Sequence, residues 1–175
     1  MSVTLTKPRS KKSPGVVPVH REGGQWIGKK PHAGVVNFYV HGPTGKIMAK
    51  DFTPFKLIEM LQVGLPVREL TDLQAGLAVP MEKLAPMLGI SKATFHRRKG
   101  AGERLGSAES DRVVRFARLL GKAIKVFGDR EDARQWLGSP QFGLGNAVPL
   151  DYAKTEVGAR EVENLLGRIE YGVYS

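Results

Sequence analysis

From Pro54 onward, apolar residues recur every three or four positions, which is the spacing of amphipathic helices. Polar capping residues and helix-ending glycines divide this part of the chain into separate segments. The pattern predicts helices over residues 54–63, 66–77, 81–88, 91–99, 108–127 and 156–170, with a short helix after Asp129. Residues 138–153 hold several glycines and prolines, so we expect a loop there. The predicted fold class is all-α.

Caps and apolar faces give these helices expected ends and sides. Thr53, Ser91, Ser107 and Thr155 each precede an apolar-periodic run and are expected to be N-caps. The first helix should place three apolar residues at helical spacing on one buried face. These residues are Phe55, Ile58 and Leu61, and Leu57 and Met60 widen the face.

The N-terminal part follows a different pattern. Residues 1–34 are basic and rich in Gly and Pro, which predicts a tail that buries little. Residues 35–40 are β-branched and aromatic, a turn follows at 41–45, and residues 46–49 can pair back. The sequence thus allows a short hairpin, although an isolated hairpin is only marginally stable. Addition to a partner's sheet edge and simple disorder both remain open.

The last nine residues, 167–175, stay patterned to the end of the sequence. Ile169 continues the apolar face of the last helix, and Tyr171, Val173 and Tyr174 follow it. Termini are usually polar and frayed, so an aromatic end indicates docking on another surface. The two readings are an anchor that enters a partner's pocket and a terminus folded back on its own core.

Composition narrows the class of protein. The chain has 175 residues, of which 41% are hydrophobic, enough for one modest core or two small ones. It contains no cysteine, which excludes disulfides, thiolate nucleophiles and cysteine-ligated zinc. No apolar run reaches the ~20 residues of a membrane span, and the N-terminus lacks a secretory signal. We therefore expect a soluble cytoplasmic protein that does not associate with membranes.

Charge is unevenly distributed along the chain. The net charge is +10, and residues 1–53 hold nine Lys or Arg against two Asp or Glu. Residues 107–175 hold ten of each sign and are neutral. This separation indicates a basic front for a polyanion and a neutral back for another protein. A solvated basic surface without a partner is the alternative.

Residues 84–99 have the features of a helix-turn-helix. Ala85 is small enough for two helices to cross closely, and Gly89 suits a tight turn with positive φ. Ser91 begins the second helix, whose N-terminal part would enter the major groove of DNA. Arg97 is suited to a base edge or a phosphate, and Lys92 and Lys99 to phosphates. The predicted DNA-binding residues are Ser91, Lys92, Thr94, His96, Arg97, Arg98 and Lys99. An ordinary three-helix core with a solvated basic helix is the alternative.

Catalytic and metal-binding chemistry is not indicated. The four histidines lack metal-ligand spacing, and the run 143–145 lacks the Lys-Ser/Thr pair of a phosphate loop. The serines form no hydrolase elbow. We expect neither an enzyme nor a cofactor.

Residues 89–175 resemble the Xre/MbcA/ParS-type antitoxins, the partners of RES-domain toxins. The resemblance rests on the runs 89–98, 109–112, 126–129 and 155–175, together with Ala133 and the pair 136–137. It covers about half the chain and leaves residues 1–53 unexplained. The chain departs from the family mainly between residues 139 and 153, which puts the loop contacts in doubt more than the fold.

This resemblance implies a function and an organisation. The domains expected are a basic N-terminal extension (1–53), a helix-turn-helix domain (54–106) and a C-terminal helical toxin-binding domain (107–175). The family implies neutralisation of an NAD-degrading RES toxin by direct contact, and repression of the shared operon through operator DNA. We expect a homodimer within the toxin complex. The expected toxin-binding residues are Arg168, Glu170, Tyr171, Gly172, Val173, Tyr174 and Ser175. The alternative function is a free-standing transcriptional regulator with a C-terminal dimerisation unit.

Overall fold

The computed structural model describes residues 21–22, 25–26, 34–41 and 52–173, and it divides the chain into two units. The first unit is Met1–His32. Within it, β1 (Arg21–Glu22) pairs antiparallel with β2 (Gln25–Trp26). The rest of the predicted basic tail lies outside the described residues.

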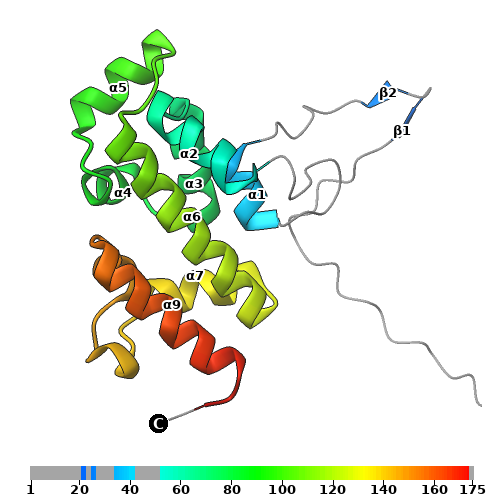
Figure 1. Ribbon diagram of the computed structural model, residues 1–175, viewed down its shortest axis with the longest axis vertical. Coiled ribbons are helices and arrows are strands. Elements are labelled where there is room, and N and C mark those ends of the chain that lie inside the picture. Colours follow the sequence, from blue (N-terminus) through cyan, green and yellow to red (C-terminus); the bar gives the residue numbers. More distant parts are fainter. Residues whose placement is uncertain (1–20, 23–24, 27–33, 42–51, 174–175) are drawn as a thin grey trace, which may run out of the picture. The chain divides into compact units, whose positions relative to one another are not determined.

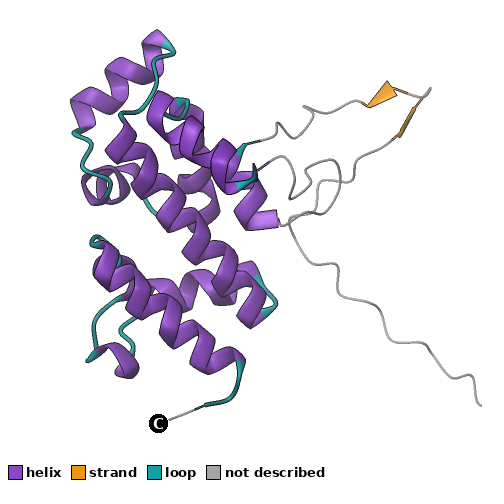
Figure 2. Ribbon diagram, viewed as in Figure 1, coloured by secondary structure: helices purple, strands orange, loops and turns teal. Residues whose placement is uncertain are grey.

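The second unit, Ala33–Ser175, is built from helices (Figures 1 and 2). The elements in chain order are α1 (Val35–His41), α2 (Pro54–Val63), α3 (Val67–Leu77), α4 (Met81–Met87), α5 (Lys92–Ala101), α6 (Ser107–Phe127), α7 (Arg130–Gly138), η2 (Phe142–Leu144), α8 (Pro149–Tyr152) and α9 (Glu156–Glu170). The all-α prediction is confirmed. None of the helices within the described ranges has the length and apolarity needed to cross a membrane.

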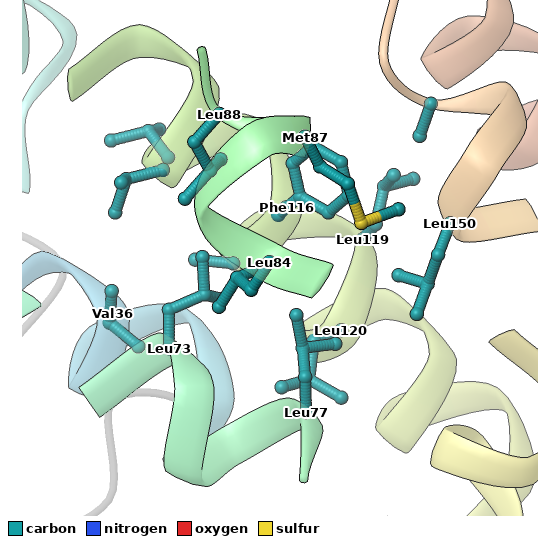
Figure 3. Packing of buried hydrophobic residues seen from close by; sticks show 14 of the residues in the cluster. Val36, Leu73, Leu77, Leu84, Met87, Leu88, Phe116, Leu119, Leu120 and Leu150 are labelled. Carbon is teal, nitrogen blue, oxygen red and sulfur yellow. The ribbon is translucent and has the colours of Figure 1, made fainter. Parts of the chain in front are cut away.

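The long helix α6 is the axis of this unit. It packs against three helices that precede it in the chain, α1, α2 and α3, and against two that follow it, α7 and α9. Its residues Phe116, Leu119 and Leu120 are fully buried. Figure 3 shows side chains of α3, α4 and α6 meeting in one apolar cluster, with Leu77 beside Leu120. Both ends of the unit therefore depend on the same central helix.

Residues 35–40 form helix α1, so the predicted hairpin is wrong at its first strand; residues 46–49 lie outside the described part. Val35, Val36 and Val40 are buried on one helical face. The N-terminus of α1 is satisfied from α3, where the Glu69 carboxylate accepts a hydrogen bond from the Val36 N–H at 3.0 Å. Burial and a remote cap thus override the local preference of β-branched residues for strands.

The carboxyl group of Glu69 is itself buried. This burial raises the pKa of Glu69, and the N–H groups of Val36 and Val35 oppose the rise by hydrogen bonding to the carboxylate. The approach is close, because a Cβ on Gly34 would lie 2.7 Å from Glu69 Oε1. A side chain at position 34 would therefore have to displace the Glu69 carboxylate from the N-terminus of α1.

Three of the four predicted N-caps are confirmed. The side chain of each of Thr53, Ser91 and Thr155 accepts a hydrogen bond from the N–H group three residues later in the chain. The cap predicted at Ser107 is wrong: Ser107 is the first residue of α6 and Gly106 is its N-cap. The Gly106 N–H donates to Glu109 Oε2 at 2.6 Å, so the acid of the first turn closes this end.

Two other predictions need correction. In α2, Phe55 and Ile58 are exposed. Leu57, Met60 and Leu61 are the residues that pack against the core. The apolar face of α2 is wide, and only the part formed by Leu57, Met60 and Leu61 faces the core. The predicted loop 138–153 contains the single turn η2 and the short helix α8, which begins at a proline suited to the first helical position.

Candidate functional site

Helices α4 and α5 form the predicted helix-turn-helix. Leu84, Leu88 and Ile90 are buried, and the Ile90 N–H donates to the Ala85 carbonyl at 2.9 Å, which closes the turn. Gly89 has φ +74°, in the left-handed region that favours glycine. The small residue, the apolar residues and the glycine therefore have the positions that the sequence predicted.

Ser91 fixes the beginning of α5. Its Oγ accepts from the Thr94 N–H at 3.1 Å and donates to Thr94 Oγ1 at 2.9 Å. The side chain of Phe95 is buried one residue further along. These contacts orient the helix so that Lys92, His96 and Arg97 are exposed.

The basic side chains of α5 are paired with acids of the same chain. Arg97 Nη1 lies 2.9 Å from Glu103 Oε1, and the Arg97 side chain is 63% exposed. Lys92 Nζ lies 3.7 Å from Glu82 Oε1 of α4, with both side chains exposed. Such exposed ion pairs contribute only roughly 0–1 kcal/mol to stability, so a phosphate can displace the acid with little loss of free energy. Lys92 and Arg97 are thus accessible cations.

Arg98 and Lys99 differ from these two. The side chain of Arg98 is only 19% exposed, and its guanidinium pairs with Glu109 on α6. Arg98 therefore joins the end of α5 to the start of α6. Lys99 Nζ lies 5.8 Å from the centroid of the Phe95 ring, a distance typical of a cation–π contact. Among the predicted DNA-binding residues, Arg98 is the one that the structure turns inward.

Residues of α6 that sequence reasoning did not select hold the motif together. Arg112 Nη1 donates to the Leu88 carbonyl at 3.0 Å and lies over Gly89, where a Cβ would clash with it. Glu109 binds Arg98 on one side and the Gly106 N–H on the other. The run 109–112 contributes to the family resemblance, but its residue types do not indicate these contacts with α5 and the turn.

At the other end of the unit, the last turn of α9 carries the predicted tail. Gly172 has φ +67°, the Val173 N–H donates to the Arg168 carbonyl at 2.9 Å, and the Gly172 N–H donates to the Ile169 carbonyl at 3.2 Å. This pair of bonds is the Schellman arrangement that ends a helix at a left-handed glycine. The chain therefore leaves α9 in a fixed direction through Val173.

The apolar side chains of this turn face solvent. Tyr171 is 80% exposed and Val173 is 56% exposed. The alternative reading, in which the end folds back on its own core, is therefore wrong for these two residues. Tyr174 and Ser175 lie outside the described residues.

The two charged residues of the predicted tail have different surroundings. Glu170 Oε1 lies 2.8 Å from Lys125 Nζ of α6, and this hydrogen bond raises the pKa of Lys125. Arg168 is partly buried, and its Nε has no hydrogen-bond partner among the described residues. An unpaired buried donor is unfavourable, and an acceptor can reach this Nε only if the Arg168 side chain moves.

An exposed aromatic residue outside the predicted site lies on η2. Phe142 is 91% exposed, although its neighbour Leu144 is buried. Sequence reasoning assigned this segment to a loop and did not select Phe142, because an isolated aromatic among glycines gives no periodic signal. Within the described residues, no group of three or more His, Asp or Glu side chains is arranged to hold a metal ion.

Comparison with protein families gives two matches. Residues 56–118 match the model of the antitoxin Xre-like helix-turn-helix domain. Residues 122–172 match the model of the antitoxin Xre/MbcA/ParS C-terminal toxin-binding domain. The matched segments contain both of the surfaces described above.

Individual relatives agree with these matches. The Antitoxin Xre of Yersinia enterocolitica serotype O:8 / biotype 1B (strain NCTC 13174 / 8081) is 32% identical over 120 residues, which span 68% of this chain and 81% of the relative. The Antitoxin Xre of Photorhabdus laumondii subsp. laumondii is 35% identical over 117 residues, 66% of this chain and 79% of the relative. A Prs ADP-ribosylating antitoxin of Sphingobium sp. (strain YBL2) is 26% identical over 132 residues, 70% of this chain and 83% of the relative.

Proposed function

The chain belongs to the Xre/MbcA/ParS family of antitoxins, and we propose that it neutralises a RES-domain toxin by placing its C-terminal turn in the toxin's NAD-binding active site. The observation that carries this proposal is the exposure of Tyr171 and Val173 on a turn of fixed geometry. Because these apolar side chains are presented by a turn of fixed geometry, burying them against a partner loses little conformational entropy.

The chemistry of the turn suits a pocket that binds NAD. Such a pocket is deep and carries polar groups for the phosphates and the riboses. A tyrosine supplies a large apolar surface with a polar tip and few rotamers, which favours Tyr171 as an anchor. Arg168 supplies a positive charge beside the turn, and Glu170 supplies an acceptor at the rim. Gly172, Tyr174 and Ser175 complete the proposed tail.

The second part of the proposal concerns DNA. The exposed cations of α5 would bind the operator of the shared operon, with Arg97 at a base edge and Lys92 at a phosphate. Two copies of the chain, as a homodimer, would present two recognition helices to half-sites about 34 Å apart. Repression of the operon would then take place in the cytoplasm, where the operator lies.

The name of the Sphingobium relative bears on the toxin's chemistry. It refers to ADP-ribosylation, a transfer that uses NAD as the donor of the ADP-ribosyl group. A toxin that degrades NAD and a toxin that transfers its ADP-ribosyl group both need an NAD pocket. The proposed action of the tail is the same for either, and it needs no catalytic group on this chain.

Competition with NAD is the direct test. A purified RES toxin from the same operon is titrated with the full chain at low and high NAD concentrations, and nicotinamide release is measured. If the turn occupies the NAD pocket, the concentration of chain that gives half inhibition rises in proportion to NAD above its KM. Inhibition independent of NAD contradicts a tail in the active site. Operator binding without any inhibition of the toxin favours the free-standing regulator instead.

A further inference from the structure

We infer that Phe142 of η2 is a second anchor for the toxin, on the same binding surface as the turn at the end of α9. This inference rests on the proposed function, because the toxin is the partner to which it assigns Phe142.

Phe142 is an unusual surface residue in this unit. Phenylalanine is among the residues most often buried, and a ring that is 91% exposed keeps nearly all its apolar area in water. Single exposed apolar residues are common on proteins and need no explanation. Phe142 is not isolated in this sense, since Tyr152, Val157 and Tyr171 are also exposed within the segment that matches the toxin-binding domain.

The segment around Phe142 is tightly bonded. The Gln141 N–H donates to the Ala147 carbonyl at 3.0 Å, and the Asn146 N–H donates back to the Gln141 carbonyl at 2.9 Å. Gln141 Nε2 also donates to the Trp136 carbonyl at 2.9 Å, which ties η2 to the end of α7. The Gly145 N–H donates to the carbonyl of Phe142 itself at 3.0 Å. The backbone that presents Phe142 is therefore already ordered in the free chain, so binding through this ring loses little conformational entropy.

The same segment is held against α9. A Cβ on Gly143 would lie 2.7 Å from Leu165 Cδ1, so η2 approaches this helix as closely as a glycine permits. Leu165 precedes Tyr171 by six residues, which corresponds to roughly 9 Å along a helix axis. An interface of standard size covers about 800 Å² of each partner, a patch some 30 Å across. One protein can therefore cover both η2 and the terminal turn.

The occupant to which these observations point is the toxin. Phe142 and Tyr171 both lie within residues 122–172, the segment that matches the toxin-binding domain. Another exposed ring of this unit, Phe55, is 80% exposed on α2 and lies outside that segment. Phe55 therefore provides a control of matched chemistry and exposure in the same molecule.

The experiment compares Phe142→Ala with Phe55→Ala in the full chain. Affinity for a purified RES toxin from the same operon is measured by calorimetry, and the mass of each free variant is measured by sedimentation. We expect Phe142→Ala to weaken binding at least tenfold, as for interface anchors, and Phe55→Ala to change it less than twofold. Phe142→Leu keeps much of the apolar area and should lose less than the alanine variant.

Three results overturn the inference. The first is a Phe142→Ala variant that binds the toxin as tightly as Phe55→Ala does. The second is toxin affinity unchanged while Phe142→Ala alone lowers the mass of the free chain, which would assign the ring to a second copy. The third is an unaltered chain that binds no toxin, which overturns the proposed function as well. Far-UV circular dichroism confirms that the variants compared are folded.

Discussion

The recognition helix α5 and the turn at the end of α9 present opposite kinds of surface. On α5 the apolar ring of Phe95 is buried, and the exposed cations Lys92 and Arg97 are paired with acids of the same chain. On the α9 turn the apolar side chains of Tyr171 and Val173 are exposed, and the charged Glu170 is paired with α6. One surface offers charge and the other offers apolar area.

This difference predicts different responses to salt. Binding of α5 to DNA exchanges acids and counterions for phosphates, so its affinity should fall steeply as salt rises. The proposed binding of the toxin through Tyr171, Val173 and Phe142 would remove apolar area from water, an effect that salt screens very little. The two surfaces are also joined through α6, so a change at one surface can be tested for its effect on the other.

The largest effect is expected at the contact between α8 and α9. Gly158 lies against the Tyr152 carbonyl group, and a Cβ at this position would lie 2.8 Å from the carbonyl carbon and clash with the oxygen. Gly158→Ala must therefore displace α9, and we expect it to lower the free energy of unfolding by about 2–3 kcal/mol in chemical denaturation. Toxin binding should fall with it, while operator binding stays.

Gly138→Ala is the matched control for this variant. Gly138 is the last residue of α7, and nothing lies within 4 Å of a Cβ built there. We expect its stability to be unchanged or to rise by up to about 1 kcal/mol, because alanine restricts the unfolded chain. An equal loss of stability in both variants would contradict the clash at Gly158. Loss of operator binding in Gly158→Ala would contradict the independence of the two ends of the unit that α6 joins.

A smaller effect is expected on α5. Arg97→Ala should weaken operator binding by roughly 1–3 kcal/mol, about tenfold or more, since a specific side-chain contact is lost. Its former partner Glu103 is 40% exposed and stays hydrated. Lys56→Ala is the control, because Lys56 is also exposed and also paired with an acid, but lies on α2. Fluorescence anisotropy with operator DNA separates the two, and equal affinities would exclude Arg97 from the DNA interface.

The smallest effect is a pH dependence centred on Glu69. Burial raises the pKa of Glu69 above its ordinary value of 4.5, so the folded chain binds this proton more tightly than the unfolded chain. The contribution of Glu69 to stability is therefore full below pH 4.5 and is lost as pH rises through the folded pKa. Thermal unfolding at a series of pH values should show this component in the unaltered chain and lack it in Glu69→Gln. Identical pH profiles would contradict the assignment.

Sequence reasoning succeeded where a contact joins residues close in the chain. The caps at Thr53, Ser91 and Thr155 bond to N–H groups within three residues, so the residue types alone indicate them. The role of Gly89 could also be predicted from the sequence, because its positive φ is a local requirement of the turn. The fold class followed from the same local signals.

The features that sequence reasoning missed depend on residues far apart in the chain. Helix α1 is capped by Glu69, which lies 33 residues from Val36. Arg98 looks like a DNA contact in the sequence, and only its pairing with Glu109 on α6 turns it inward. The exposure of Phe142 is likewise set by how η2 packs on α9. The bounds and cap of α5 could therefore be predicted from local residues, whereas the surroundings of Arg98 and Phe142 could not.

The most direct test of the account removes residues 171–175 and measures both activities on one preparation. The variant keeps α9 through Glu170 and its buried Leu166, so the domain should remain folded. We predict that affinity for the RES toxin falls at least a hundredfold while affinity for operator DNA changes less than twofold. A shortened chain that still binds and inhibits the toxin as tightly as the full one would contradict the claim that this turn blocks the toxin.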